Sequence, residues 1–310
     1  MYDKTGTCCP RVNILLSAYN GEAYIKDQIE SLVRQDYPNL GIYVRDDGST
    51  DRTPAILKQC KRDFGKERDI HIFRGKNLGY GPSFLGLLKR CGQADYWAFC
   101  DQDDVWMPGK ITRAVAWMES QEDRDKTPLL YHSAFYETDE KLAVRGIYLP
   151  EDREDYSFQK AVTECMHMGF SSLINARLRD LALKGRIRRI VSHDWWVELI
   201  VMAFGRAVFD PEPASYHRRL LASQSSAAMT ARVRWFFKAM RSEPEIRNLA
   251  REFMGTFGQD MTEDDRKLLS LFVPPAGTGK TLKKAFYPAR WRTSPASELS
   301  LRLLMLLGRL

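Results

Sequence analysis

Short apolar runs alternate with stretches of helical periodicity through the first 120 residues. The apolar runs lie at residues 12–17, 40–44, 70–73 and 94–100. After the first run, Ile25, Ile29 and Leu32 recur at the spacing of one helix face. Strands that alternate with helices form βαβ units. The pattern therefore predicts an α/β fold with a mainly parallel sheet flanked by helices.

The pattern changes after residue 118. A charged segment at residues 119–126 predicts a boundary between two halves. The sequence beyond it predicts strands at 129–131, 142–149 and 168–174, a helix at 176–183, and an apolar helix that opens at 191–196 and runs to Phe204. After residue 213 the pattern becomes helical and charged, and we expect no further strand there.

Three of the predicted strands end in polar sequences. These sequences are Ser-Ala-Tyr-Asn at 17–20, Asp-Asp-Gly-Ser at 46–49 and Asp-Gln-Asp-Asp at 101–104. Ligands of parallel sheets bind beyond the carboxyl ends of the strands. We therefore expect the three segments to open onto one edge of the sheet and to form one site.

The segment at 101–104 carries three carboxylates, those of Asp101, Asp103 and Asp104. Clustered carboxylates repel one another unless a cation lies among them. Mg²⁺ and Mn²⁺ prefer oxygen ligands and are commonly shared with a phosphate. A solvated acidic loop is the alternative, but the apolar residues before the cluster and Trp106 after it favour a metal–phosphate site.

The other polar segments have simpler explanations as well. Asp46 and Asp47 suit a turn or a helix cap, but two successive acids at a strand end also suit hydrogen bonds to a ribose hydroxyl or a base N–H. Asn77 and Gly79 lie in a glycine-rich turn whose backbone amides would be useful beside a phosphate. Asp194 heads an apolar helix, where it is either a favourable first-turn acid or a general base, and the residues alone favour neither.

Charge and composition limit the class of protein. The 310 residues carry a net charge of +7, and between residues 280 and 310 the seven Lys and Arg residues face only one acid, Glu298. The leucine-rich end of this segment predicts an amphipathic helix, either packed or bound to an anionic membrane, and the basic residues favour the membrane. Acidic strand ends argue against nucleic acid there.

Other features of the sequence point to a cytoplasmic enzyme. No apolar run reaches the ~18 residues that a membrane span requires. The six cysteines are scattered, with neither a disulfide framework nor a zinc spacing. We therefore expect a reducing, cytoplasmic setting, with peripheral contact at the inner face of the cell membrane.

The polar motifs together resemble the family 2 glycosyltransferases, specifically a bacterial rhamnosyltransferase-like group. The matching motifs occur in the family's order at residues 16–22, 45–51, 77–80, 101–106 and 193–196, within a region of about 11–220. The resemblance implies a GT-A (Rossmann-like) fold, a nucleoside-diphosphate sugar donor, a divalent metal and inversion at the anomeric carbon. It divides the chain into a GT-A domain at 1–225, with a nucleotide-sugar half at 1–120 and an acceptor half at 121–225, and a helical C-terminal extension at 226–310.

The resemblance also implies roles for individual residues. Asp194 would be the catalytic base, and Asp101, Asp103 and Asp104 would hold Mg²⁺ or Mn²⁺ in a DXD-like motif. His217 or Arg218 would replace a Tyr-Arg-x-His-Gly element that this sequence lacks. The expected nucleotide-sugar-binding residues are Ser17, Tyr19, Asn20, Glu22, Asp46, Asp47, Asn77, Gly79, Asp101, Gln102, Trp195, Trp196, His217 and Arg218.

The expected reaction is transfer of a sugar to a hydroxyl of a growing cell-surface polysaccharide, with a saccharide or lipid-linked saccharide as acceptor. The resemblance favours rhamnose from dTDP-rhamnose. One alternative is a transferase of another sugar, with UDP-glucose, UDP-galactose or a UDP-N-acetylhexosamine as donor. The less favoured alternatives are a sugar-nucleotide nucleotidyltransferase and an inactive binding homologue. The nucleotidyltransferase needs an early glycine-rich triphosphate loop, and residues 12–24 contain none.

Overall fold

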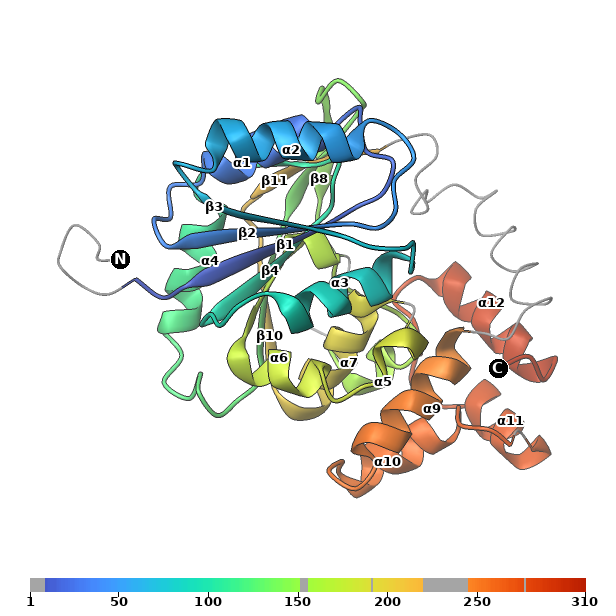
Figure 1. Ribbon diagram of the computed structural model, residues 1–310. Helices are drawn as coiled ribbons and strands as arrows, with labels where there is room; N and C mark the ends of the chain where they lie inside the picture. The colour runs from blue at the N-terminus through green and yellow to red at the C-terminus, as the bar shows by residue number, and fades with distance from the viewer. Residues whose placement is uncertain (1–8, 151–155, 191, 220–244, 276) are drawn as a thin grey trace.

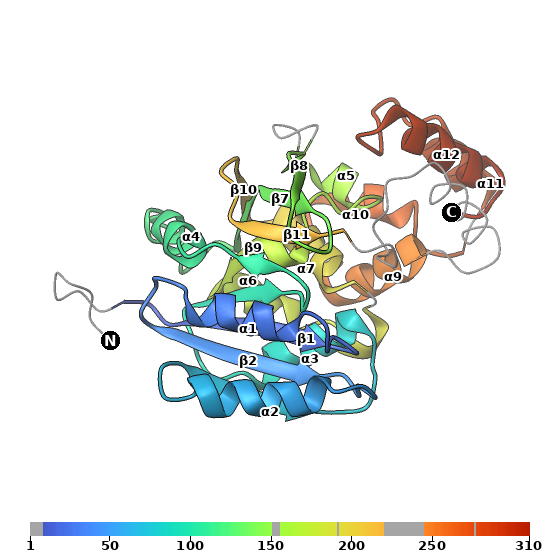
Figure 2. The same ribbon diagram turned by 90° about the horizontal axis from the view of Figure 1, so that it is seen from above.

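A computed structural model describes residues 9–150, 156–190, 192–219, 245–275 and 277–310 (Figures 1 and 2). The predicted alternation of strands and helices is confirmed in the first half of the chain. The elements are β1 (Val12–Ala18), α1 (Ile25–Val33), β2 (Leu40–Asp46), α2 (Thr53–Phe64), β3 (Asp69–Arg74), α3 (Tyr80–Arg90), β4 (Tyr96–Cys100), β5 (Val105–Trp106) and α4 (Lys110–Glu119).

The second half adds shorter strands and two groups of helices. The strands are β6 (Leu129–Ser133), β7 (Phe135–Thr138), β8 (Val144–Tyr148), β9 (Ser172–Asn175), β10 (Arg206–Asp210) and β11 (Ser215–Arg218). The helices are α5 (Phe158–Ala161), α6 (Ala176–Ala182), α7 (His193–Phe204), α9 (Glu245–Phe257), α10 (Glu263–Ser270), α11 (Thr278–Ala285) and α12 (Pro295–Leu306), with 3₁₀ turns at Gly169–Ser171 and Ile187–Arg189.

The main sheet contains seven strands in the order β10-β6-β9-β4-β1-β2-β3. β9 runs antiparallel to both of its neighbours, and the other pairs are parallel. The sheet is therefore mixed and mainly parallel, as expected. Strands from both sides of the charged segment at 119–126 belong to it, so the two halves share one sheet.

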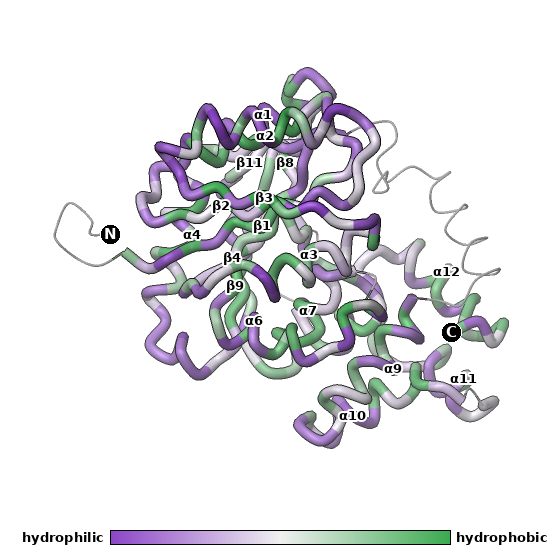
Figure 3. Tube along the Cα trace, viewed as in Figure 1, coloured by the Kyte–Doolittle hydropathy of each residue, from purple (hydrophilic) through white to green (hydrophobic). Residues whose placement is uncertain are grey.

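Side chains that alternate along the strands fill one hydrophobic core on each face of the sheet. Ile14 and Leu16 of β1 belong to the core beneath α1, α2 and α4, whereas Leu15 belongs to the core that contains α3, α6 and α7. Helices accordingly cover both faces (Figure 1), and hydrophobic residues concentrate along β1 and β4 (Figure 3). Both faces of the central strands are dry, which explains their nearly continuous apolar runs.

A second sheet of four strands, in the order β5-β11-β7-β8, corrects the prediction for the region after residue 213. β11 lies there, where we expected no strand. Its sequence, Ser-Tyr-His-Arg, is short and polar. It is extended because it pairs with β7 on one side and β5 on the other, both more than 75 residues earlier in the chain. Pairing between distant segments leaves no periodicity in a four-residue run.

The C-terminal helices pack against α7 and its surrounding core. Trp196 of α7 contacts Phe253 and Phe257 of α9, with ring centroids 5.5 and 5.8 Å apart, and residues of α9, α10 and α12 belong to the same core as α7. The predicted boundary at 225/226 lies outside the described residues, and the domain division stays a prediction. Within the described ranges, no helix combines the length and apolar character needed to cross a membrane.

Candidate active site

The carboxyl ends of β1, β2 and β4 meet at one edge of the main sheet. β1 pairs with β2 up to Ala18 and Asp46, and with β4 up to Leu16 and Cys100. The loop after β1 is bonded to both neighbouring loops. The Tyr19 N–H donates to Gln102 Oε1 (2.8 Å), and the Asn20 N–H donates to Ser49 Oγ (3.0 Å). The predicted convergence of the three polar segments is confirmed.

The carboxylates of Asp46 and Asp47 are buried and held by the protein. Asp46 Oδ1 accepts a hydrogen bond from the Ser49 N–H (2.9 Å). Asp47 accepts from the N–H groups of Leu78 (2.9 Å) and Gly79 (3.0 Å) and is paired with the buried Arg45. Gly79 has a φ of 83°, a conformation that glycine adopts without strain. Asp47 therefore fixes the turn at 77–79 against the end of β2.

Several expected nucleotide-sugar residues use their side chains to brace these loops. Ser17 Oγ lies 2.6 Å from Ser83 Oγ. Asn20 and Glu22 accept from the N–H groups of Thr50 and Arg52, each at 2.9 Å, and Asn77 accepts from the Gly79 N–H at 3.1 Å. Their proposed contacts with a donor stay predictions, but the contacts within the protein give each of them a role in shaping the site.

The acidic segment at 101–104 is far less well satisfied. Asp104 is fully buried, and its Oδ2 has no hydrogen-bond partner among the described residues. Burial, together with the charges of Asp104 and Asp103, raises the pKa of Asp101 well above its ordinary value. Burial and the charge of Asp104 raise the pKa of Asp103 to about 6. The cluster is thus short of positive charge, and its oxygen-only donor set fits a hard divalent cation.

The three carboxylates do not converge tightly on one point. Among the described residues, Cys165, His167 and Glu198 instead form the group whose potential metal-ligand atoms all lie within 4.8 Å of one another. In that set, His167 Nδ1 is 2.6 Å from Glu198 Oε2, which is a hydrogen-bond distance. We therefore treat it as a hydrogen-bonded network, and the metal assignment at 101–104 stays a prediction.

His217 and Arg218 of β11 both contact the acidic segment. His217 Nδ1 lies 2.8 Å from Asp104 Oδ1, and Arg218 Nη1 donates to the Asp103 carbonyl (2.8 Å). Burial lowers the pKa of His217, but the hydrogen bond and charge of Asp104 outweigh it, and the net shift is upward. The pairing of β11 with β5 places both side chains there, although their register was ambiguous in the sequence.

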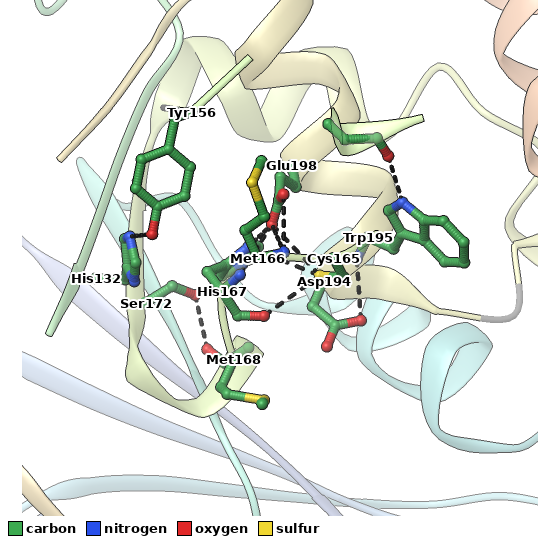
Figure 4. Close-up of polar contacts among 12 residues, drawn as sticks. His132, Tyr156, Cys165, Met166, His167, Met168, Ser172, Asp194, Trp195 and Glu198 are labelled. Atoms are coloured by element: carbon green, nitrogen blue, oxygen red, sulfur yellow. Dashed lines mark hydrogen bonds and ion pairs between the residues drawn. The ribbon is translucent and has the colours of Figure 1, made fainter. Parts of the chain in front are cut away.

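Asp194 lies at the start of α7 (Figure 4). Its Oδ1 accepts from the Ser192 hydroxyl and from the Trp195 N–H (3.0 Å). Its Oδ2 accepts no hydrogen bond from the described residues. Burial alone would raise its pKa, but the charges of His193 and His167 and these hydrogen bonds hold the pKa of Asp194 below its ordinary value. The carboxylate is therefore ionised at neutral pH, with one oxygen available to accept a proton.

The two tryptophans that follow Asp194 are core residues. Trp196 is fully buried, and its Nε1 donates to the Ala182 carbonyl (3.0 Å). Trp195 is nearly buried, and its Nε1 donates to the Ala161 carbonyl (2.6 Å). Neither indole N–H is available to a ligand, so we leave both residues out of the proposed donor site. They anchor the helix that carries Asp194.

The structure adds a network that sequence reasoning missed (Figure 4). Glu198, one helical turn after Asp194, is buried and accepts hydrogen bonds from the N–H groups of Met166 (2.9 Å) and His167 (3.0 Å). A Cβ atom on Gly169 would lie 3.3 Å from Asp194 Cβ. Glu198 thus holds the 165–169 loop against Asp194. The signal in the sequence that could have indicated this network is a single acid inside the apolar run 197–201.

Comparison with known sequences identifies the class to which this fold and site belong. Residues 13–170 match the model of glycosyl transferase family 2, which spans just over half of the chain. The chain belongs to this family, and its fold is of the GT-A type, as expected. Among solved structures, Staphylococcus aureus TarS 1–349 in complex with UDP aligns with a TM-score of 0.55 at 13% identity, over 96% of this chain and 88% of that one.

Individual relatives match this chain over only part of their length. A dTDP-rhamnosyl transferase, RfbG, of Shigella flexneri is 27% identical over 185 residues, which are 59% of this chain and 63% of that protein. An uncharacterized glycosyltransferase of Haemophilus influenzae is 36% identical over 115 residues, 37% of this chain and 34% of that protein. The match therefore covers between a third and two thirds of these relatives. The mannosyltransferase PcManGT of Pyrobaculum calidifontis, solved with GDP-Man and Mn²⁺, aligns with a TM-score of 0.53 at 15% identity, over 98% and 86% of the two chains.

Proposed function

We propose that this protein is an inverting glycosyltransferase that moves a sugar from a nucleoside-diphosphate donor to a hydroxyl group of a saccharide acceptor. The observation that carries the proposal is that two acidic sites interact electrostatically but have pKa values shifted in opposite directions. Asp194 has a lowered pKa and one unbonded oxygen, and its charge contributes to the raised pKa of Asp101. An ionised base and a cation-deficient acidic cluster that interact electrostatically suit proton removal and leaving-group binding, respectively.

In this proposal each acidic group has a separate task. Asp194 accepts the proton of the acceptor hydroxyl as its oxygen attacks the anomeric carbon from the face opposite the leaving diphosphate, so that the configuration inverts. Asp101, Asp103 and Asp104 would hold Mg²⁺ or Mn²⁺, which when bound supplies positive charge for the diphosphate. Asp46 and Asp47 lie at the end of β2, on the other side of β1 from β4, and we assign them to the nucleoside. His217 and Arg218 keep the acidic segment in place.

The favoured donor is dTDP-rhamnose, and the favoured acceptor belongs to a growing cell-surface polysaccharide, either free or lipid-linked. The support comes from relatives. RfbG is named as a dTDP-rhamnosyl transferase, and TuaG of Bacillus subtilis, 32% identical over 109 residues, is named as a putative teichuronic acid biosynthesis glycosyltransferase. A UDP-hexose or UDP-N-acetylhexosamine donor is the alternative, since TarS has been solved with UDP-GlcNAc.

The test is donor binding followed by turnover. A thermal-shift screen of nucleotide sugars with Mn²⁺ should raise the Tm for one nucleoside class, because a ligand that binds only the folded chain stabilises it. Release of nucleoside diphosphate from that donor should fall by about 10²–10⁴-fold in Asp194→Asn, the range that general-base catalysis contributes, while the thermal shift remains. Full activity in Asp194→Asn would overturn the base assignment. The absence of a shift with every nucleotide sugar would overturn the function, and pyrophosphate release from a nucleoside triphosphate would favour a nucleotidyltransferase.

We also propose peripheral binding to an anionic membrane through α12. Its outward side exposes leucines at helical spacing, with relative exposures of 73% for Leu299, 46% for Leu303 and 50% for Leu306. The surrounding segment carries the chain's basic excess, which complements anionic lipid. Binding to vesicles that contain anionic lipid, compared with zwitterionic vesicles, tests the proposal. Leu303→Glu combined with Leu306→Glu should abolish sedimentation with the vesicles, and Val144→Glu, at an exposed apolar residue on β8, should not.

A further inference from the structure

A cavity of about 480 Å³ lies between the second sheet and the start of α12. This volume is within the range of small-molecule sites. Its walls carry polar groups and the rings of Tyr148 and Tyr156. The walls come mainly from β7, β8, the 164–166 loop, the residue after β11, and the start of α12 with the residues just before it. The polar residues of the wall include Glu137, Tyr148, Glu164, Arg219, Thr293 and Ser297.

The C-terminal segment forms one wall of this cavity and is firmly attached to the rest of the domain. The Thr293 N–H donates to Glu164 Oε2 (2.8 Å), and the Thr163 hydroxyl donates to the Trp291 carbonyl (2.6 Å). Gln159 Nε2 donates to the Arg290 carbonyl (2.9 Å). These bonds join residues about 130 positions apart. The cavity is therefore a built feature of the fold and not a gap beside a loose tail.

The cavity is lined in part by the loop that contacts the proposed base, and the described strand ends of the proposed donor site do not line it. Cys165 and Met166 line it, and the loop that continues from them reaches Gly169, which packs against Asp194. The charge of Asp194 is one cause of the raised pKa of the Cys165 thiol, after burial and the charge of Glu198. Among the described residues that line the cavity, none precedes Glu137 in the chain, so the strand ends that carry Asp46, Asp47 and the acidic segment take no part.

We propose that this cavity binds a neutral sugar unit of the acceptor, an inference that rests on the function proposed above. Glu137 and Arg219 form an ion pair on its wall, and Glu164 accepts hydrogen bonds from the N–H (2.8 Å) and the hydroxyl (2.9 Å) of Thr293. Carboxylate oxygens accept more than one hydrogen bond, so these groups and the Ser297 hydroxyl suit sugar hydroxyls. Tyr148 stacks on Phe135 with ring centroids 4.6 Å apart and adds an amphipathic aromatic surface. Among the described residues that line the cavity, the charged groups are two carboxylates and one guanidinium, a balance that disfavours an acidic sugar or a phosphate.

The test uses the full chain and a direct binding measurement. Ser297→Trp places an indole in the cavity, and Ala296→Trp, at an exposed neighbour that does not line the cavity, is the matched control. The probes are methyl glycosides of neutral hexoses and deoxyhexoses, together with the matching hexuronic acids, measured by saturation-transfer NMR and titration. We expect a neutral glycoside to bind the wild-type chain and Ala296→Trp equally, and to bind Ser297→Trp at least tenfold more weakly, with unchanged far-UV circular dichroism.

Each other outcome overturns the inference. Wild-type affinity in Ser297→Trp would show that the glycoside binds elsewhere. A preference for the hexuronic acids, or no binding by any neutral glycoside, would exclude a neutral acceptor subsite. The nucleotide-sugar thermal shift separates this result from the proposed function, because loss of glycoside binding in Ser297→Trp with the donor shift intact concerns the cavity alone. The absence of a donor shift in the wild-type chain concerns the proposed function.

Discussion

Two strand ends at one edge of the main sheet are acidic, those of β2 and β4 on either side of β1, and they differ in how their charge is satisfied. At the end of β2, Asp47 is paired with Arg45 and accepts two backbone N–H groups. At the end of β4, Asp101 and Asp103 have raised pKa values, and Asp104 keeps one buried oxygen without a hydrogen bond from the described residues. The first cluster is paired within the protein, since Asp46 Oδ2 also lies 3.2 Å from Arg74 Nε, whereas in our proposal a cation supplies the positive charge that the second cluster lacks.

The difference means that the cluster at the end of β2 is preorganised by the protein, whereas the stability of the cluster at the end of β4 should depend on a bound cation. A carboxylate that the protein already satisfies stabilises the fold and presents a fixed surface to a ligand. A carboxylate that the protein leaves unsatisfied destabilises the fold until a cation arrives, and that cost makes cation binding part of the folding free energy. The same substitution should therefore have opposite effects on stability in the two clusters.

The largest effect is expected from Asp47→Ala. Removing one partner of a buried ion pair leaves the charge of Arg45 uncompensated, which typically costs about 3–5 kcal/mol, and the turn at 77–79 also loses its acceptor. Urea denaturation should show this loss. Asp63→Ala, at an exposed acid on α2, is the control and should change the free energy of unfolding little. An Asp47→Ala variant as stable as the wild type would remove the contrast between the clusters.

Addition of Mn²⁺ should have the next largest effect, now through the second cluster. At a concentration 100 times its Kd, a ligand of the folded state adds about 2.7 kcal/mol to stability. Mn²⁺ should raise the Tm of the wild-type chain, and Asp104→Asn should abolish most of the shift. An equal Mn²⁺ shift in wild type and Asp104→Asn would move the metal site elsewhere, with Cys165, His167 and Glu198 as the first place to look.

Asp103→Asn should stabilise the metal-free chain at neutral pH. The folded-state pKa of about 6 lies above the ordinary 3.8, so the folded chain binds more protons between these values and stability falls as pH rises through this window. Replacement by Asn should remove that fall and add about 1–3 kcal/mol at pH 7. Urea denaturation in EDTA from pH 4 to 7 measures it. A destabilised variant at pH 7 would mean that Asp103 is already satisfied.

The smallest effect is expected from His217→Ala. Asp104 holds the pKa of His217 above its ordinary 6.5, so the stabilisation by the protonated ring is fully present below pH 6.5 and is lost as pH rises through the folded-state pKa. The wild type should exceed the variant by about 1 kcal/mol at pH 6, and by less at pH 8. A difference that grows with pH would contradict a protonated His217 beside Asp104.

The contrast between the clusters also shows which parts of the site could be predicted from the sequence. The β1, β2 and β4 ends were predictable because each strand is a local apolar run and each motif follows directly after it. β11 was not, because its pairing with β5 and β7 depends on residues far along the chain. The contacts of His217 with Asp104 and of Glu198 with the 166–167 backbone have the same origin. Sequence motifs locate carboxylates, but only the assembled fold shows which of them are satisfied.

The hydrogen bonds that attach residues 290–293 to the 159–164 segment also have an evolutionary consequence. They make the last part of the chain a wall of the cavity, while the described strand ends of the first half take no part in it. Changes in the C-terminal segment could therefore alter the shape of that cavity without disturbing the strand ends that carry the acidic clusters. Under the proposed function, such changes would alter the acceptor that the chain recognises while they leave its donor site intact.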